Sequence, residues 1–336
     1  MLIDIARKGG LNAAARSGAS IVGRGRAVIE IEAAALAQLS SVLDDNFAHA
    51  VDLILETRGR IIVTGMGKSG HIGRKLAATL ASTGTPAIFV HPAEAAHGDL
   101  GMLMTGDALI VMSNSGATSE LKTILRHAKT ISCPIIGIAA QPDSPVMHAA
   151  DVKLVLPAAR EACPANIAPT TSTVLMLALG DALAIAVMSV RGISREGLQA
   201  LHPGGVIGSR LLPVNEFMHS GDTMPLVPAA MPMREVVVAI TQKSFGIAGV
   251  VDADGRLVGV ITDGDLRRHV ERLLMSTAAD VMTAGPKTIP EGTYAEDALA
   301  IMNANKITAL FVMRHDEPEV PLGLVHIHDF SRLGMI

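Results

Sequence analysis

The sequence predicts an α/β fold in which a doubly wound parallel sheet, flanked by helices on both faces, is followed by two smaller α+β units. Two observations predict it. From residue 61 onward, short apolar runs alternate with helical patterns, which is typical of a parallel sheet with crossover helices. After residue 213, a unit of roughly 60 residues occurs twice, and a unit of that size buries too little apolar surface to fold alone. The chain of 336 residues is long enough for two or three domains.

The first half of the chain supplies the helices and strands of the sheet domain. Residues 28–57 contain no Gly or Pro and keep a helical apolar period, so we expect two consecutive helices there. Five apolar runs that end in small or polar residues are expected to be strands: Ile61–Thr64, Ala87–Val90, Ala108–Met112, Ile135–Ala139 and Lys153–Leu156. In such a sheet the ligand site is expected in the crevice at the carboxyl ends of the strands.

A helix from Thr171 to Val190 is expected to close this domain. Its apolar stretch from Val174 to Val190 is the one membrane candidate, but it is at the short limit for a span and contains Asp181. We therefore interpret it as a helix buried inside a soluble protein. The Gly- and Pro-rich segment "LHPGGVIGSRLL" that follows predicts a domain boundary.

The repeat in the C-terminal part is visible as two similar segments. "LVGVITDGDLRR" begins at Leu257 and "PLGLVHIHDFSR" at Pro321, and the two segments place Gly259 opposite Gly323 and Asp265 opposite Asp329 at one offset. Each copy predicts an apolar strand and then a helix with an Asp in its first turn.

Composition and charge exclude several classes of function. The formal net charge is −4 and basic residues are spread along the chain, which argues against nucleic acid or an anionic membrane as a partner. Cys133 and Cys163 are too few for a disulfide framework, and the first thirty residues contain no apolar secretory segment. We therefore expect a cytoplasmic protein in which neither cysteine is needed as a nucleophile.

The turn after the first expected strand, "TGMGKSGHIG" at residues 64–73, has several interpretations. Its glycines match G-x-G-x-x-G, but the acidic residue that a dinucleotide site needs after the next strand is missing, and His91 stands there. A P-loop fails because Ile62 occupies the place of its first glycine. Two interpretations remain: an anion-binding turn for a small phosphorylated ligand, or glycines that only allow close packing while Lys68 is solvated.

A second polar loop, "VMSNSGATSELKTIL", leaves the third expected strand. Hydroxyls beside the free N–H groups of a helix start bind a phosphate dianion well, and this loop supplies Ser113, Ser115, Thr118 and Ser119. The alternative is an ordinary N-cap made by Thr118 or Ser119 before Glu120. A third polar segment, Thr170–Thr173, opens the buried helix. Two such loops on neighbouring strands favour a phosphate site.

These motifs together resemble one family. The segments "GMGKSGHIGRK", "STGTPAIFVHPAEAAHGDLG", "SNSGATSE", "REACPANIAPTTST" and "LHPGG" are similar to the sugar isomerase (SIS) domain of bacterial D-arabinose 5-phosphate isomerases, and the C-terminal repeat resembles a pair of CBS domains. The resemblance implies an intramolecular oxidoreductase that interconverts D-ribulose 5-phosphate and D-arabinose 5-phosphate, the entry step to the Kdo sugar of lipopolysaccharide. One departure is Ala117, where relatives often have an acidic residue.

The resemblance also implies a domain division and an assembly. It implies an SIS domain at 28–205, a linker at 206–213 and CBS domains at 214–273 and 278–336, while the arm at 1–27 stays unassigned. It further implies a homotetramer in which active sites are shared between subunits.

The resemblance assigns the site residues as well. It implies catalytic roles for Lys68, Glu120, Glu161 and His202. It implies that the sugar phosphate contacts Gly67, Ser69, Gly84, Thr85, His91, His97, Ser113, Ser115 and Thr118. No cofactor is required, and an inhibitory zinc ion is implied at His91; the spacing of His91 and His97 argues against a structural zinc site. In the CBS pair, a nucleotide or nucleotide-sugar is implied at Thr262, Asp265 and Asp329, the alternative being a packing module without a ligand.

Aldose–ketose isomerisation moves a proton between C1 and C2 through an enediol, so it needs a base and a group that stabilises the oxyanion. We expect Glu161 to be the base, with a pKa raised by a water-shielded crevice, and Glu120 to be the second choice. Lys68 is expected to neutralise enediolate or phosphate charge, and His202 to serve ring opening or proton transfer.

Other interpretations of the same residues remain open. Glu120 could be an acid in a helix first turn, Glu161 could pair with Arg160 on the surface, and His202 could be structural. For the whole chain, the alternatives are a sugar-phosphate sensor without catalysis, or an isomerase of another phosphorylated aldose. A sensor normally needs an output element such as a helix-turn-helix, and none is recognisable in residues 1–60.

Overall fold

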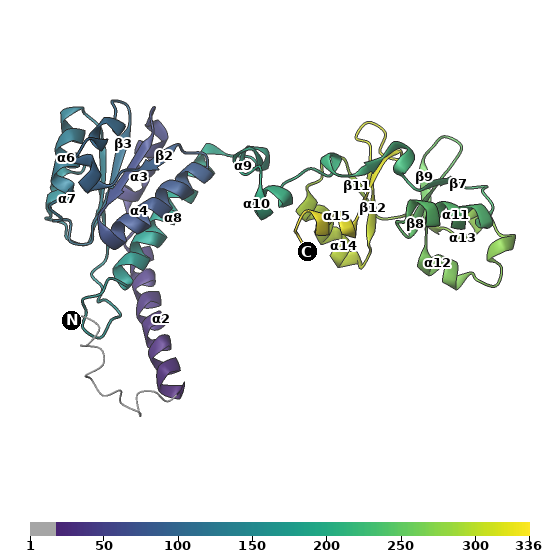
Figure 1. Cartoon of the computed structure of the whole chain (residues 1–336), viewed down its shortest axis with the longest axis horizontal. Helices are drawn as coiled ribbons and strands as arrows, with labels where there is room; N and C mark the ends of the chain where they lie inside the picture. The colour runs from purple at the N-terminus through teal and green to yellow at the C-terminus, as the bar shows by residue number, and fades with distance from the viewer. Residues whose placement is uncertain (1–17) are drawn as a thin grey trace. The chain divides into compact units, whose positions relative to one another are not determined.

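Five parallel strands form the sheet of the first part of the chain. The computed structural model describes residues 18–336, and the chain divides into two compact units, Met1–Ser194 and Arg195–Ile336. In the first unit the strand order is β2-β1-β3-β4-β5. Every pairing is parallel, which confirms the predicted parallel sheet, and Figure 1 shows this sheet with its helices. The strands are β1 (Ile61–Gly65), β2 (Ala87–Phe89), β3 (Ala108–Met112), β4 (Ile135–Ala139) and β5 (Val152–Val155).

Helices cover both faces of this sheet because successive side chains of each buried strand point to opposite faces. On β1, Ile61 and Val63 pack into the core that contains the helices on one face, whereas Ile62 packs into the core on the other face. The first face carries α2 (Gly18–Ser41), α3 (Asp45–Glu56), α4 (Gly67–Ser82) and α8 (Thr171–Arg191). The second carries α5 (Pro92–Ala95), α6 (Leu121–Thr130) and α7 (Pro145–Ala149), with the 3-10 helix η2 (Asp99–Met102) following α5.

The two helices predicted for residues 28–57 are α2 and α3, but α2 begins ten residues earlier, at Gly18. Residues 18–27 of the unassigned arm are therefore helical, whereas residues 1–17 lie outside the described part of the chain. The extension was missed because three glycines within it interrupt the helical pattern.

Helix α8 contains the apolar stretch from Val174 to Val190. By length and hydropathy it could cross a membrane, yet it packs against α4, α2 and α3. Gly180 allows the close approach to α4, since a Cβ there would lie 3.3 Å from Leu76 Cδ1. This packing places one face of α8 in the core of the sheet domain.

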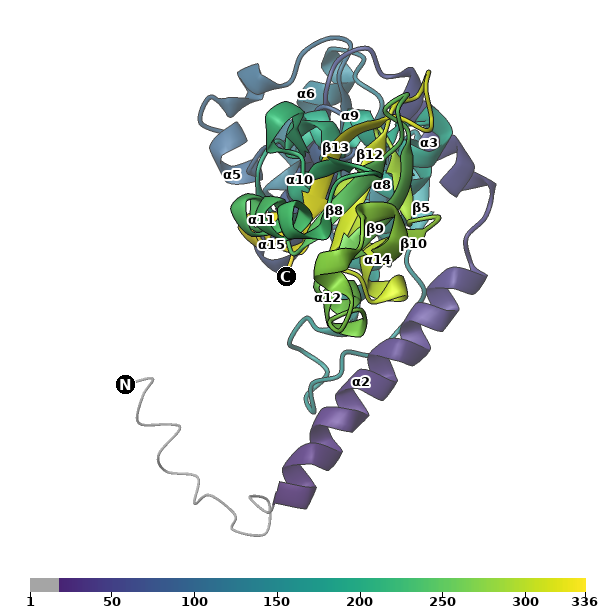
Figure 2. The same ribbon diagram turned by 90° about the vertical axis from the view of Figure 1, so that its right-hand side faces the viewer.

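The second unit contains two four-stranded sheets, ordered β10-β9-β8-β7 and β11-β12-β13-β6. Each repeat lends its first strand to the sheet of the other, because β6 pairs with β13 and β10 pairs with β9. Figure 2 shows these strands at the centre of the unit with helices around them. The strands are β6 (His219–Ser220), β7 (Leu226–Pro228), β8 (Ile247–Val251), β9 (Leu257–Thr262), β10 (Thr283–Ala284), β11 (Thr288–Pro290), β12 (Ala309–Met313) and β13 (Pro321–His326).

The matched glycines of the repeat are explained by this exchange. A Cβ on Gly259 would lie 2.5 Å from the sulfur of Met282, and one on Gly323 would lie 2.5 Å from the sulfur of Met218. Each glycine therefore clears space for a methionine beside the strand lent by the other repeat.

The helices of the second unit begin immediately after the boundary at Ser194. They are α9 (Arg195–Leu201), α10 (Gly205–Arg210), α11 (Met233–Lys243), α12 (Asp263–Arg268), α13 (Ala278–Val281), α14 (Ala295–Asn305) and α15 (Ile327–Arg332), with 3-10 turns η3 (Val214–Glu216), η4 (Gly221–Thr223) and η5 (Leu273–Met275). The predicted linker 206–213 is largely α10, and contacts divide the chain before residue 195 rather than after residue 205. The Gly and Pro residues of this segment punctuate short helices instead of forming an extended linker.

Candidate active site

The candidate site lies where the strand order reverses. The chain leaves β1 on one side to form β2 and later passes to the other side of β1 to form β3, and the carboxyl ends of strands at such a reversal are the usual ligand site of a parallel sheet. Gly65 at the end of β1 is opposite Met112 at the end of β3. Both polar loops singled out in the sequence therefore start next to each other.

The glycine turn joins β1 to α4. A Cβ on Gly70 would lie 2.4 Å from the carbonyl oxygen of Gly65, so close packing explains that glycine. Gly67 is different: its φ is +57°, in the left-handed region, and a Cβ there would meet no atom within 4 Å. Gly67 is thus required by the turn that opens α4, and this N-terminus has no side-chain cap. Lys68 is exposed and Ser69 half-buried in the same first turn.

The serine loop between β3 and α6 is held together by its own hydroxyls. Ser113 is buried, its Oγ lies 3.0 Å from Thr118 Oγ1, and it accepts the N–H of Gly116 at 3.1 Å. Ser115 is exposed and its Oγ accepts the N–H of Ala117 at 3.3 Å. These contacts bring the hydroxyls of Ser113, Ser115 and Thr118 into one turn.

Glu120 occupies the N-cap position of α6, without a side-chain capping bond. The interpretation of Thr118 or Ser119 as that cap is therefore wrong. Ser119 Oγ donates to Glu120 Oε2 at 2.8 Å, and this bond, followed by the backbone N–H of Glu120, lowers the pKa of the carboxyl group. Glu120 is exposed, so it is a carboxylate at neutral pH that a ligand can reach.

Glu161 is bound to the N-terminus of α8. Its carboxylate accepts the N–H of Thr170 at 2.7 Å and the N–H of Ser172 at 3.3 Å, and both hydroxyls donate to it as well. Within residues 18–336 these groups hold the carboxylate, and Arg160 does not. Burial raises the pKa of Glu161, but the bonds from Ser172 and Thr170 outweigh it and hold the pKa below the ordinary value. The expectation of a raised pKa is therefore wrong.

Helices α4 and α8 run side by side in the same direction. Lys75 of α4 pairs with Asp181 of α8, and Arg191 at the end of α8 donates to the carbonyl oxygen of Gly84, beyond the end of α4, at 2.6 Å. The partners are 106 and 107 positions apart, so the register is constant along the helices. The N-termini of α4 and α8 therefore lie at the same edge of the sheet, which is also where α6 begins. Three positive helix ends face one edge, which favours a doubly charged phosphate and an enediolate there.

Two predicted substrate contacts lie elsewhere. Gly84 and Thr85 precede β2, and β2 starts opposite Ile61 at the amino edge of the sheet. Thr85 is buried, and its Oγ1 accepts from Arg191 at 3.1 Å. Within one chain both residues fix the end of α8, away from the glycine turn and the serine loop. His202 belongs to the second unit, whereas Lys68, Glu120 and Glu161 belong to the first.

The two histidines after β2 differ in their surroundings. His91 follows β2 at the carboxyl edge, and its Nδ1 is buried without a hydrogen-bond partner in the described structure. His97 is exposed. Across residues 18–336, no three metal-binding side chains converge on a point. A zinc ion at His91 stays a prediction.

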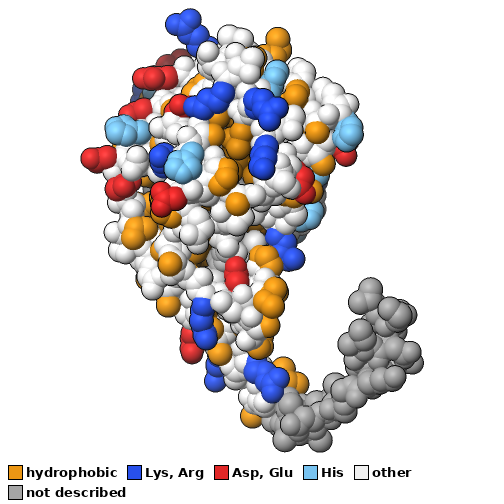
Figure 3. All heavy atoms as spheres, turned by 90° about the vertical axis from the view of Figure 1, so that its left-hand side faces the viewer, with side chains coloured by type: hydrophobic (Ala, Val, Ile, Leu, Met, Phe, Trp, Pro, Cys, Tyr) orange, Lys and Arg blue, Asp and Glu red, His pale blue; other side chains and the backbone are white. Residues whose placement is uncertain are grey.

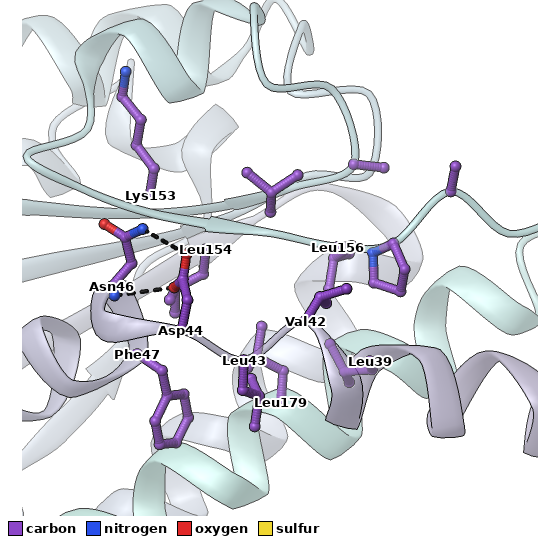
Figure 4. Close-up of a pocket in the computed structure, with 14 residues that line it drawn as sticks. Leu39, Val42, Leu43, Asp44, Asn46, Phe47, Lys153, Leu154, Leu156 and Leu179 are labelled. Carbon is purple, nitrogen blue, oxygen red and sulfur yellow. Dashed lines mark hydrogen bonds between the residues drawn. The ribbon is translucent and has the colours of Figure 1, made fainter.

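A pocket of about 350 Å³ in the same unit contains none of the predicted residues. It lies between the α2–α3 turn and the edge strand β5 and is lined mainly by Leu39, Val42, Phe47, Leu154 and Leu179 (Figure 4). Its carboxylate, Asp44, is bound to Asn46, and Lys153 extends away from its apolar floor. Among the described lining residues, the one carboxylate is engaged by Asn46 and caps α3, and the floor is apolar, so this pocket does not offer the groups that isomerisation needs.

Comparisons with known proteins agree with this geometry. The SIS domain family matches residues 54–186, and the CBS domain family matches residues 214–272 and 278–335. Arabinose 5-phosphate isomerase KdsD of Pseudomonas aeruginosa is 44% identical over 312 residues, which cover 92% of this chain and 95% of that protein. The chain belongs to the arabinose 5-phosphate isomerase family. KdsD of Escherichia coli K12 is 42% identical over 316 residues, covering 93% of this chain and 95% of that isomerase.

A solved structure supports the same family. The structure of c3406 from E. coli CFT073, solved in complex with arabinose 5-phosphate, has a TM-score of 0.54 and 33% sequence identity, and it covers 56% of this chain and 100% of that one. The SIS fold and the tandem CBS pair predicted from the sequence are thus confirmed for this isomerase.

The second unit of the isomerase contains a cleft of about 710 Å³. Arg268, Lys287 and Lys306 line it together with Asp265 and His326. Burial and the neighbouring His328 lower the pKa of His326, so its imidazole is neutral at pH 7. Asp263 also lines the cleft, and Arg268 is paired with Asp265, so Lys287 and Lys306 are the basic side chains that remain for an anionic ligand.

The two aspartates predicted to hold a ligand are already bonded. Asp265 is 2% exposed, and its carboxylate accepts from Thr262 Oγ1 and from Thr283 Oγ1 at 3.0 Å. Burial raises the pKa of Asp265, but the bonds from Thr262 outweigh it and lower the pKa. Asp329 is 3% exposed and accepts from His219 Nε2 at 3.0 Å, with Arg332 as a further partner. Both aspartates cap the helices α12 and α15.

Proposed function

We propose that this isomerase interconverts D-ribulose 5-phosphate and D-arabinose 5-phosphate through an enediol, and so feeds the synthesis of Kdo and lipopolysaccharide. The observation that carries the proposal is the identity of 42–44% to KdsD isomerases over 95% of their length. The site supports it, because Lys68, Glu120 and Glu161 lie at one edge of the sheet with three helix N-termini.

The phosphate is proposed to bind the serine loop. Ser113 and Thr118 bring their hydroxyls together there, and the N-terminus of α6 adds its dipole. Lys68 and the uncapped N-terminus of α4 are proposed to stabilise the enediolate oxygen.

Glu161 is proposed to carry the proton between C1 and C2. Its lowered pKa keeps it a carboxylate at neutral pH, ready to accept a proton, and the bonds from Thr170 and Ser172 fix the orientation of its oxygens. Glu120 is the alternative base. His202 is proposed to serve ring opening or proton transfer between the oxygens.

The test is isotope incorporation. The protein is incubated with D-ribulose 5-phosphate in deuterated water, and the expected result is deuterium at C2 of arabinose 5-phosphate. Glu161→Gln should lower turnover by orders of magnitude while substrate binding survives. Absence of any exchange by the unaltered protein would support a sugar-phosphate sensor, and exchange only with another phosphorylated aldose would redirect the substrate assignment.

The second unit is proposed to bind a nucleotide or nucleotide-sugar in its cationic cleft. Titration calorimetry with AMP and with a nucleotide-sugar tests this. Because the carboxylate of Asp265 is already bonded to Thr262 and Thr283, we expect Lys287→Met and Lys306→Met to weaken binding more than Asp265→Asn does. A cleft that binds neither ligand would favour a packing module.

The isomerase is also proposed to act as a cytoplasmic homotetramer. In α2, 24 residues long, only Ala35 and Leu39 are buried within the chain, whereas Ile21, Val22 and Ile29 are more than half exposed. Figure 3 shows hydrophobic side chains, with Lys and Arg side chains among them, in the lower part of the view. Such an apolar helix surface fits an interface between copies. Sedimentation of the protein and of Ile29→Glu tests this, since the variant should lower the assembly state.

A further inference from the structure

The loop that carries Glu161 is closed by bonds from its own residues. Asn166 Oδ1 accepts the backbone N–H of Glu161 at 2.7 Å, and the N–H of Asn166 donates to the carbonyl oxygen of Cys163 at 2.9 Å. The sulfur of Cys163 accepts two further backbone N–H groups, from Ile167 and Ala168, each at 3.2 Å. The segment directly after Glu161 thus folds into a small compact turn.

Asn166 has an unusual conformation for a residue with a side chain. Its φ is +54°, in the left-handed region, which Asn and Asp tolerate better than other non-glycine residues. In this conformation the side chain folds back onto the backbone of Glu161. Gly would adopt the same φ without offering the acceptor oxygen, so the choice of Asn is explained by the hydrogen bond.

Backbone and carboxylate of Glu161 are therefore fixed by different groups. Its carboxylate is bound by Thr170 and Ser172 of α8, whereas its N–H is bound by Asn166. Neither Asn166 nor Cys163 hydrogen-bonds the carboxylate, so each acts on the reaction only through the placement of Glu161. A shift of roughly 1 Å in a reacting group can cost about a hundredfold in rate.

We propose that Asn166 and Cys163 are positioning residues of the isomerase, which hold the turn after Glu161 so that its carboxylate stays aligned with the N-terminus of α8. This inference rests on the proposed role of Glu161 as the proton carrier.

The two cysteines provide an internal contrast. Bonds from the N–H groups of Ile167 and Ala168 lower the pKa of Cys163, and its side chain is accessible. Burial, followed by the charge of Asp107, raises the pKa of Cys133 to about 12. Iodoacetamide should therefore alkylate Cys163 selectively: the thiolate sulfur bonds to the reagent's CH₂ carbon and iodide leaves. The added group blocks the sulfur as an acceptor for the turn.

The central test uses variants that separate the hydrogen bond from the backbone conformation. Asn166→Gly keeps the positive φ and removes the acceptor, whereas Asn166→Asp retains an acceptor oxygen and tolerates the same φ. The matched control is Asn303→Ala in the exposed part of α14. We expect Asn166→Gly to lower kcat ~10- to 100-fold with KM within about threefold of the original. Asn166→Asp should recover most of the rate, and Asn303→Ala should leave it unchanged.

The pH profile distinguishes positioning from a general loss of folding. Once the turn loosens, the bonds that hold the Glu161 pKa down weaken, the pKa rises, and the acidic limb of kcat moves to higher pH. In Cys163→Ala the acidic limb of kcat should also move to higher pH. Cys163→Ser keeps an acceptor atom, so its pH profile should resemble that of the original protein. Alkylation should reduce kcat in the unaltered protein but leave Cys163→Ala unaffected.

Two outcomes overturn the inference in distinguishable ways. If Asn166→Gly and Cys163→Ala keep the original kcat and pH profile while Glu161→Gln is inactive, the positioning role is wrong and the proposed function stands. If Glu161→Gln turns over normally, the proposed role of Glu161 fails, and the positioning role fails with it. Circular dichroism and thermal melts of each variant show whether a lower kcat comes from unfolding. If Asn166→Gly unfolds, the kcat of Asn166→Asp compared with that of the original protein still tests the hydrogen bond to Glu161.

Discussion

Replacing Ser172 by Ala tests the binding of Glu161 to α8 directly. Ser172 is 7% exposed, and its hydroxyl donates to Glu161 Oε1, while its backbone N–H and both bonds from Thr170 stay available in the variant. Loss of one hydrogen bond to a charged group costs about 1.5–3 kcal/mol. We therefore expect the unfolding free energy at neutral pH to fall by about that amount, as measured by urea unfolding.

The pH dependence of this loss follows from the sign of the pKa shift. Because the folded pKa of Glu161 lies below the ordinary value of 4.5, its bonds contribute stability above that value and lose it as pH falls through the folded pKa. The difference between Ser172→Ala and the original protein should be constant from about pH 6 to about pH 8 and shrink below 4.5. In the same variant the pKa of Glu161 rises, so the acidic limb of kcat moves to higher pH.

The matched control is Ser189→Ala, which makes the same change on an exposed turn of the same helix. It should change the unfolding free energy by no more than ~0.5 kcal/mol and leave the pH profile of kcat where it is in the original protein. If Ser172→Ala behaves like Ser189→Ala, the carboxylate of Glu161 is not held by α8, and the explanation of its lowered pKa is refuted.

Three further changes test other parts of the molecule. Gly70→Ala should lower the unfolding free energy by about 1–3 kcal/mol, because its Cβ would lie 2.4 Å from the carbonyl oxygen of Gly65. Gly23→Ala, whose Cβ would meet no atom within 4 Å, should not lower it. Equal melting temperatures for the two variants would contradict this prediction. Lys68→Met should raise KM or lower kcat ~10-fold, and because Lys68 is exposed the melting temperature should not change. If steady-state kinetics gave unchanged KM and kcat, the proposed role of Lys68 in binding or catalysis would be contradicted. Asp329→Asn should destabilise the second unit by about 1.5–3 kcal/mol, because a buried carboxylate bonded to His219 loses its charge; an unchanged urea transition would show that these bonds contribute little.

Much of the fold was predictable because buried parallel strands are short, continuous apolar runs. β3 and β4 have the predicted bounds, β1 and β2 differ from the prediction by one residue at their carboxyl ends, and β5 begins and ends one residue earlier than predicted. The start of α2 was not predictable, because glycines lower helix propensity and the sequence therefore predicts no helix before residue 28. In the structure α2 nevertheless continues through these glycines.

The site was predictable only in part. Strand order determines that the loops after β1 and β3 meet, so the glycine turn and the serine loop could be paired from the sequence pattern. Gly84 and Thr85 belong to the same sequence segment as His91, but they precede β2 whereas His91 follows it, so the direction of the chain alone places them at the opposite edge of the sheet. The hydroxyls of Thr170–Thr173 predict a polar helix start, but residue types alone do not determine which carboxylate binds there.

The sequence by itself determined the alternation of strands and helices, the repeat, and the kinds of side chain available for isomerisation. Those features depend on the local period of apolar residues, on turn-forming residues and on residue type, all of which can be read from the sequence without knowing the fold. Only the tertiary structure decided the ionisation of Glu161. Its pKa depends on whether burial or hydrogen bonding dominates, and that balance is set by Thr170 and Ser172, which reach its carboxylate only when the turn folds back onto the N-terminus of α8.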